Sequence, residues 1–301
     1  NAKTAEELLQ FADIALDRAK KKGRNQHIFY SNDEQFHVVD QLSLSRNLHR
    51  ALEKDEFTLY FQPQINTQTN KVIGVEALIR WTDHTGQSIP PDKFIPLAED
   101  TGLIIPIGHW VIDEACKNLK HLQDLGFLDI PMSINIAAQQ FSEHRFVEAL
   151  TNTVKKYQLN TEMIELELTE RTVMGDIKAT ISTLMELRNA GYKIAIDDFG
   201  TGYSSLSYIK HLPIDRLKID KSFITDIPGD KGSIAIVKAI TQLAHGINMD
   251  VIAEGVENLM QVSFINSVDC NEAQGYLYSK PLGIEELIVF LKQPNKHIKE
   301  A

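Results

Sequence analysis

Cysteine is scarce in this chain, since Cys116 and Cys270 are the only two among 301 residues. Neither stands close to the other or belongs to a Cys/His cluster. Disulfide scaffolds and structural zinc sites both need grouped thiols, so the sequence argues against both classes. We therefore expect a protein of a reducing compartment.

Long apolar runs are lacking as well. No uninterrupted apolar stretch comes near the roughly eighteen residues that span a bilayer, and no charged-then-apolar leader is present. Even the apolar segment 94–112 contains Glu99, Asp100 and His109. We expect a soluble, cytoplasmic segment without direct membrane contact. It begins in a helical pattern without methionine, so we expect a piece of a longer protein, whose other segments can carry a membrane anchor.

Positive charge is in deficit. Lys and Arg total 31 against 41 Asp and Glu, which gives a formal charge of −10. A surface of this sign disfavours a nucleic-acid polymer or an anionic membrane as partner. A small anionic substrate remains compatible if metal ions and a few local cations reverse the sign inside a cleft. Hydrophobic residues make up 43% of the chain, enough for a large core.

Residues 4–22 have the pattern of an amphipathic helix. Thr4 and Glu7 form a capping-box pair, and Gly23 follows a basic last turn. The expected apolar face is Leu8, Phe11, Ala12, Ala15 and Ala19. A short strand is expected at 27–31. One helix and one strand are too little to bury a core of their own.

The rest of the chain alternates short apolar segments with longer helical patterns. A helix is expected over about 38–52, and residues 296–301 are expected to form a disordered tail. The expected strands lie near 56–63, 71–81, 130–136, 163–169, 193–198, 214–219, 250–254 and 273–277. Eight strands alternating with helices favour a closed α/β barrel of the (β/α)8, TIM-like type over an open sheet.

Acidic and amide side chains recur where these segments end. They are Glu76, Asn135, Glu167, Glu170, Asp197, Asp198, Asp220, Glu254 and Glu257, with Lys218 among them. A parallel barrel gathers the C-terminal ends of its strands on one face, so these residues should meet in one cup. Carboxylates at such close range need protons or cations between them, and hard oxygen ligands select Mg²⁺ or Mn²⁺. The sequence thus predicts a metal-dependent catalytic centre.

Each acid alone also has a plain explanation as a helix cap. Asp197 and Asp198 are adjacent, directly after an apolar strand, so capping explains one of them but hardly both. Asn135 stands between apolar neighbours, where it is either a ligand or a core amide with a partner. A Lys218 pointing into solvent and an Arg80 in a surface ion pair are the corresponding alternatives for the two cations.

Nine motifs in order carry a family resemblance. They are QP at 62–63, EALIRW from Glu76, FIPLAE at 94–99, SINIA around Asn135, ELTE at 167–170, DDFGTGYSSL at 197–206, LKID at 217–220, AEGVE at 253–257 and QGYLYSKPL at 274–282. Over about residues 40–292 the chain resembles the EAL-domain family, the cyclic di-GMP phosphodiesterases. The resemblance implies a barrel whose first strand runs antiparallel to the others, and a homodimer formed through the barrel.

The resemblance also implies roles for individual residues. Glu76, Asn135, Glu167 and Asp197 would hold one metal ion. Asp197 would bridge to a second ion held by Asp198 and Glu254. Lys218 would lie beside the nucleophilic water, and Glu76 and Glu254 would share in catalysis. The implied substrate contacts are Gln62, Ile79, Arg80 and Gln274. Mg²⁺ or Mn²⁺ would support the reaction, and Ca²⁺ would inhibit it.

A second group would act in regulation. In the family a glutamate at the position of Glu170 anchors the loop after the paired aspartates, which links the metal site to the dimer surface. The implied members are Glu170, Gly200, Thr201, Gly202 and Glu257. The alternative is a plain tight turn with a capping glutamate.

The N-terminal segment ADIALDRAKKKGRN resembles the end of a GGDEF (diguanylate cyclase) domain. We therefore divide the chain into a GGDEF remnant with linker at 1–33, an EAL barrel at 34–295 and the tail at 296–301. The cyclase signature loop is absent, so no cyclase activity is expected.

The function implied is hydrolysis of cyclic di-GMP to linear 5′-pGpG with two metal ions, which lowers the level of that bacterial second messenger. Two alternatives remain open. One is a catalytically silent cyclic di-GMP receptor that signals through a partner. The other is a different metal-dependent barrel enzyme, such as an enolising one, which the acidic cup alone would permit.

Overall fold

Eight strands close into a barrel in the computed structural model, which describes residues 4–21, 27, 44–175, 177–202 and 209–293. In barrel order the strands are β1 (Phe57–Asn66), β2 (Lys71–Thr82), β4 (Met132–Asn135), β5 (Ile164–Thr169), β6 (Lys193–Phe199), β7 (Arg216–Ile219), β8 (Asp250–Ala253) and β9 (Glu272–Ala273). The short β3 (Ser88–Ile89) pairs with the end of β2. Seven of the eight predicted strands are confirmed within a few residues at their ends, whereas the strand predicted at 273–277 shares only Ala273 with the two-residue β9.

Strand β1 runs against its neighbours. It pairs antiparallel with β2 on one side and with β9 on the other, which closes the ring. Every other neighbouring pair of the ring is parallel. The expected α/β barrel with an antiparallel first strand is therefore confirmed.

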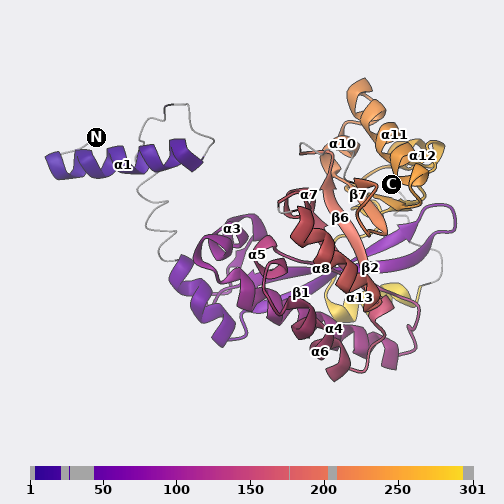
Figure 1. Ribbon diagram of the computed structural model, residues 1–301, viewed down its shortest axis with the longest axis horizontal. Coiled ribbons are helices and arrows are strands. Elements are labelled where there is room, and N and C mark those ends of the chain that lie inside the picture. The colour runs from indigo at the N-terminus through magenta and orange to yellow at the C-terminus, as the bar shows by residue number, and fades with distance from the viewer. Residues whose placement is uncertain (1–3, 22–26, 28–43, 176, 203–208, 294–301) are drawn as a thin grey trace.

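Helices surround the barrel (Figure 1). After a helical segment at 44–53 they are α3 (Pro91–Thr101), α4 (Ile104–Asp124), α5 (Ala138–Phe141), α6 (Phe146–Lys156), α7 (Glu170–Val173), α8 (Ile177–Asn189), α10 (Lys221–Thr225), α11 (Lys231–Gly246), α12 (Leu259–Ser267) and α13 (Ile284–Leu291). A 3₁₀ turn, Thr161–Met163, precedes β5. Among the described residues, no helix combines the length and apolar character needed to span a membrane.

Strand β5 shows how the sequence positions the site. Its residues alternate between apolar Ile164, Leu166 and Leu168 and acidic Glu165 and Glu167, and all five are buried. Because successive side chains point to opposite faces of a strand, the apolar set packs outward under the helices and the acids point into the barrel. The apolar core therefore lies between strands and helices, while polar groups occupy the barrel interior.

Helix α1 (Ala5–Lys21) lies apart from the barrel (Figure 1). The predicted capping box is present, with Glu7 N donating to Thr4 Oγ1 at 3.1 Å and Thr4 N to Glu7 Oε2 at 3.3 Å. The predicted apolar face is covered only in part. Phe11 and Ala19 are buried, but Leu8 is 63% exposed and Ala12 is exposed too. Helical spacing groups residues on one side, whereas burial depends on which neighbour covers that side.

Three expectations fall outside the described residues. They are the rest of the strand at 27–31 beyond His27, the first part of the helix at 38–52, and the tail at 296–301.

Candidate metal centre

The C-terminal ends of the barrel strands bring eight polar side chains together. We call them the upper layer: Gln62, Glu76, Asn135, Glu167, Asp197, Lys218, Glu254 and Gln274. The strand registers align them, since Gln62 pairs with Glu76 and Asn135 with Glu167. Glu254 and Gln274 directly follow β8 and β9. Every metal-ligand candidate from the sequence therefore reaches the same end of the barrel.

Lys218 lies at the centre of this layer. Its side chain is 1% exposed, so the alternative of a solvent-facing lysine is wrong. The Nζ atom lies 2.5 Å from Glu167 Oε2, 2.7 Å from Glu254 Oε1, 3.3 Å from Asp197 Oδ1 and 3.6 Å from Glu76 Oε2. One ammonium group therefore contacts four carboxylates that come from four different strand ends.

Amides fix the orientation of Glu76. Its two carboxylate oxygens accept from Asn135 Nδ2 at 2.7 Å and from Gln274 Nε2 at 2.5 Å. Gln274 Nε2 also donates to Gln62 Oε1 at 3.0 Å, and Gln62 Nε2 donates to the carbonyl of Ser279 at 3.1 Å. Asn135 therefore has a partner, and Glu76 is held in one position by neighbouring strands.

Burial sets the titration of these groups. Burial raises the pKa of Glu254 to about 8 despite Lys218. Burial and the neighbouring Glu76 raise the pKa of Glu167 well above its usual range. Burial opposes ionisation of Glu76 too, but Lys218 and the two amides outweigh it and lower its pKa. Burial would lower the pKa of Lys218, yet the surrounding carboxylates raise it well above its usual value.

The negative charge of these carboxylates is greater than one lysine can neutralise. Metal ions bound among them would balance the remaining charge. Glu167 Oε1 is buried without a hydrogen-bond partner. Asp197, Asp198 and Glu254 each offer an oxygen atom, and these atoms lie within 4.8 Å of one another. All the donors are oxygens, the ligand type that Mg²⁺ and Mn²⁺ prefer. The acidic cluster therefore has the chemistry to hold a divalent cation.

Asp198 takes an unusual backbone conformation at the end of the cluster. Its φ is 53°, in the left-handed region that aspartate tolerates better than most residues. Its N–H donates to Asp197 Oδ1 at 2.9 Å. Burial, Asp197 and Asp220 raise the pKa of Asp198 to about 6. Asp220 itself caps α10, accepting from Ser222 N at 3.0 Å, so the capping explanation holds for that acid.

Glu170 contacts the loop after the paired aspartates. It is 4% exposed, and its Oε2 accepts from the N–H of Gly200 at 3.1 Å. A Cβ on Gly202 would lie 2.5 Å from Glu170 Oε1, so only glycine permits this approach. Thr201 closes the turn by donating from N and Oγ1 to the carbonyl of Asp198. The loop is described only as far as Gly202.

The remaining candidates lie around the mouth. Arg80 is half-buried, makes no ion pair with the described residues, and lies over the ring of Tyr60 at 5.8 Å. Its guanidinium donates to the carbonyl of Ile79 at 2.8 Å. The Ile79 side chain packs against the core, so a substrate contact there would use its main chain. Glu257 is exposed, and its N–H donates to Gln261.

Sequence reasoning missed a second set of polar residues, two positions below the upper layer on five of the eight strands. We call it the lower layer: Gln64, Ser133, Glu165, Arg216 and Glu272. Gln64, Ser133 and Glu165 are buried, and Arg216 and Glu272 are partly buried. The signal was available in IELELTE, where Glu165 and Glu167 share a face because they are two residues apart.

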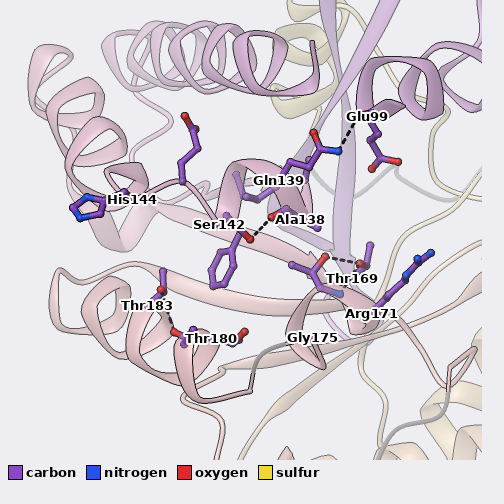
Figure 2. A pocket seen from close by; sticks show the side chains of 16 residues that line it. Glu99, Ala138, Gln139, Ser142, His144, Thr169, Arg171, Gly175, Thr180 and Thr183 are labelled. Carbon is purple, nitrogen blue, oxygen red and sulfur yellow. Dashed lines mark hydrogen bonds between the residues drawn. The ribbon is translucent and has the colours of Figure 1, made fainter. Parts of the chain in front are cut away.

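A cavity of about 620 Å³ lies on the flank of the barrel, between α5, α7 and α8 (Figure 2). Arg171 and Thr172 of α7 line it, and Gln139 donates to the carbonyl of Glu99 at its rim. No member of the upper layer lines this cavity. It is therefore separate from the acidic cluster.

Three comparisons with known proteins bear on this geometry. The model of the EAL domain matches residues 45–281. The chain is 40% identical over 288 residues to the bifunctional diguanylate cyclase/cyclic di-GMP phosphodiesterase MucR of Pseudomonas aeruginosa, covering 96% of this chain and 42% of MucR. It is 34% identical to the cyclic di-GMP phosphodiesterase PdeR of Escherichia coli, covering 98% of this chain and 44% of PdeR. The chain thus spans about two fifths of the length of these relatives.

Solved structures agree with the fold. A PaMucR phosphodiesterase in complex with c-di-GMP matches with a TM-score of 0.79 at 41% identity, covering 81% of this chain and 99% of that one. The EAL enzyme Bd1971 in its cAMP-bound form matches with a TM-score of 0.81 at 35% identity, covering 96% of this chain and 76% of that one.

Proposed function

This chain belongs to the EAL domain family, and we propose that it hydrolyses cyclic di-GMP to linear 5′-pGpG. The observation that carries the proposal is the upper layer, in which one buried lysine contacts four carboxylates at the C-terminal mouth of the barrel. Relatives named as cyclic di-GMP phosphodiesterases support it. Family membership also argues against an enolising barrel enzyme.

Two divalent ions, Mg²⁺ or Mn²⁺, would be held by this layer together with Asp198. One set of ligands would be Glu76, Asn135, Glu167 and Asp197, and Asp197 would be shared with a second set of Asp198 and Glu254. Bound there, the ions would lower the pKa of a shared water and stabilise charge on the phosphodiester. The orphaned Glu167 Oε1 and the Asp197, Asp198 and Glu254 triplet support these assignments.

Lys218 would act on the reacting groups from below. Its Nζ lies between Glu167 and Glu254, at 2.5 and 2.7 Å, and these two ion pairs hold the buried ammonium in place. From that place its ammonium can orient the attacking water or neutralise charge that builds on the phosphate, and it could accept the proton of the water only if bound cations lowered its pKa. Glu76 and Glu254 would contribute by holding the ions and the lysine in place.

Substrate would lie across the mouth of the barrel. Arg80 shares a face of β2 with Glu76 and has no ion pair with the described residues, so its planar guanidinium is free for a bidentate phosphate contact. Gln62, Gln274 and the main chain of Ile79 would supply further contacts. Gln274 already donates to Glu76 and to Gln62, so this pair of amides would also couple substrate binding to a metal ligand.

The function is tested by incubating the protein with cyclic di-GMP and separating the products. We expect pGpG with Mg²⁺ or Mn²⁺, no product with EDTA, and inhibition by Ca²⁺, whose larger and more flexible coordination fits in-line displacement poorly. If the metal-loaded protein binds the dinucleotide but releases no pGpG, the chain is a silent receptor.

Glu170→Ala should lower kcat by roughly a hundredfold, because the loop that carries Asp198 loses its anchor and a shift near 1 Å at a reacting centre has about that effect. Arg171→Ala is the matched control, since Arg171 is the next residue of α7, is exposed and makes no ion pair with the described residues. Kinetics and Mn²⁺ affinity like those of the wild type in Glu170→Ala would make the loop an ordinary turn.

Residues 1–33 are proposed to be the end of a GGDEF domain with its linker, 34–295 the phosphodiesterase and 296–301 a tail. The loop after Asp198 and the residues Gly200, Thr201, Gly202 and Glu257 would connect the metal site to a homodimer surface on the barrel. We expect no GTP cyclisation by this chain, and its detection by product chromatography would contradict the division.

A further inference from the structure

The interior of a (β/α)8 barrel is ordinarily filled by layers of branched apolar side chains. Here five of the eight strands place a polar or charged side chain directly beneath the metal centre, and Gly74, Ala195 and Ile252 occupy the other three positions. Ser133 is 2% exposed, Gln64 1% and Glu165 6%, so these groups are fully inside the protein. Each lies two residues before an upper-layer residue on its strand, or two after it on the antiparallel β1. Ser133 and Glu165 are each joined to a proposed metal ligand, Asn135 and Glu167, by two residues of one strand.

Arg216 joins this layer into one network. Its Nη1 donates to Glu165 Oε1 on β5 at 2.8 Å, and its Nε forms an ion pair with Glu272 Oε2 on β9 at 3.2 Å, in a geometry that is not a hydrogen bond. Ser133 Oγ of β4 donates to the same Glu165 oxygen at 2.8 Å. Gln64 Nε2 of β1 in turn donates to Ser133 Oγ at 3.4 Å. One guanidinium thus spans from β7 to β5 on one side and to β9 on the other.

The backbone makes room for this network. Gly74 of β2 faces Gln64, and a Cβ at Gly74 would lie 2.7 Å from Gln64 Oε1. A side chain at residue 74 would force the Gln64 amide to move from this position. The glycine at residue 74 of β2 therefore leaves the space that the Gln64 side chain occupies in the lower layer.

Stability is a poor explanation for such a layer. Removing two acids and a guanidinium from water is costly, and well-packed apolar residues of similar volume are often as stable or more so. The lower layer nonetheless lies beneath a cluster that already has an excess of negative charge. Glu165 comes two residues before Glu167 and Arg216 two before Lys218, so the Glu165–Arg216 ion pair lies directly beneath the Glu167–Lys218 ion pair.

We propose that Arg216 is a positioning residue for the hydrolysis: by bridging Glu165 and Glu272 beneath the metal centre, it sets the places of Glu167 and Lys218, which follow Glu165 and Arg216 by two residues. The inference rests on the proposed function for its kinetic readout. The inference goes beyond the proposed function because it assigns a role to a residue that is not a metal ligand.

Two variants separate positioning from charge balance. Arg216→Lys keeps the positive charge but loses the rigid fork that reaches two carboxylates at once. The triple variant Glu165→Gln, Arg216→Met, Glu272→Gln removes all three charges together, so no buried charge is left unpaired. Arg188→Met is the matched control, because Arg188 is exposed at a cavity of about 270 Å³ that also reaches Arg216 and Glu165.

The measurements are the melting temperature, the affinity for Mn²⁺ without substrate by electron paramagnetic resonance, and kcat and KM for cyclic di-GMP. In both variants we expect a melting temperature near that of the wild type. We expect kcat to fall about tenfold in Arg216→Lys and roughly a hundredfold in the triple variant, with Mn²⁺ affinity falling and KM changing little. Arg188→Met should match the wild type in all four.

The proposal is overturned if Arg216→Lys has the kcat and Mn²⁺ affinity of the wild type, or if the triple variant does. In either case the lower layer would only balance charge and would not position the metal ligands. The Mn²⁺ measurement needs no turnover. If the wild-type protein binds Mn²⁺ but does not hydrolyse cyclic di-GMP, the proposed function fails, and the effect of Arg216 on the metal site is still decided by the affinities.

Discussion

Lys218→Met is expected to lower kcat for cyclic di-GMP by roughly a thousandfold while KM changes little, a loss within the usual range for a group that moves or stabilises a proton at the reacting centre. Methionine keeps most of the volume and the unbranched shape of lysine, so packing beneath the site is retained. What disappears is the ammonium that contacts Glu167, Glu254, Asp197 and Glu76.

The measurement is steady-state kinetics at saturating Mn²⁺, with the melting temperature recorded in the same buffer. Saturating metal is needed because four carboxylates lose their shared partner, and bound cations replace part of that charge. Lys238→Met is the control, since Lys238 is exposed on α11, a helix outside the barrel, and forms none of the upper-layer contacts. A Lys218→Met variant that loses substrate affinity but keeps its maximal rate would make Lys218 a phosphate anchor.

The strands and their order were largely predictable. A parallel strand is buried on its outer face by helices, so its apolar residues form short runs that stand out in the sequence. Segments such as KIAIDD and VIAEGVE have this form and end in acids, which is why the upper layer could be predicted. The antiparallel β1 was available only from the family resemblance, because alternation along a strand is the same in either direction.

The contacts within the layer were not predictable in the same way. Lys218 could be placed at a strand end, but its four partners come from β2, β5, β6 and the end of β8, and their convergence depends on barrel closure. The lower layer was missed for a related reason. Glu165 and Arg216 carry no motif of their own, and their pairing joins strands that are not neighbours in the sheet.

Burial of α1 also lay beyond the sequence. The spacing of Leu8, Phe11 and Ala15 correctly predicts the helix, which was expected over 4–22 and is found at Ala5–Lys21. Their burial differs, however, since Phe11 is 6% exposed and Leu8 is 63% exposed. Both residues satisfy the same periodicity, so periodicity cannot separate them. Only contacts made after folding decide which one is covered.

Glu76→Ala is expected to reduce turnover by a thousandfold or more and to remove most of the stabilisation that Mn²⁺ gives the protein. Glu76 is 5% exposed, and its two oxygens are held by Asn135 and Gln274 in the middle of the upper layer. Losing it removes a proposed metal ligand and leaves both amides without their acceptor. The metal-free fold should persist, because the variant deletes one carboxylate from a cluster that has too many for its lysine.

The decisive measurement is the melting temperature with EDTA and with a series of Mn²⁺ concentrations, alongside product formation. A ligand that binds only the folded state raises stability in proportion to RT ln(1 + [L]/Kd), so weaker binding appears directly as a smaller shift. Glu186→Ala on α8, an exposed acid of the same type, should show the full Mn²⁺ shift and full activity. If Glu76→Ala kept both, the metal ions would bind elsewhere, and the upper layer would be a buried ion network without a catalytic role.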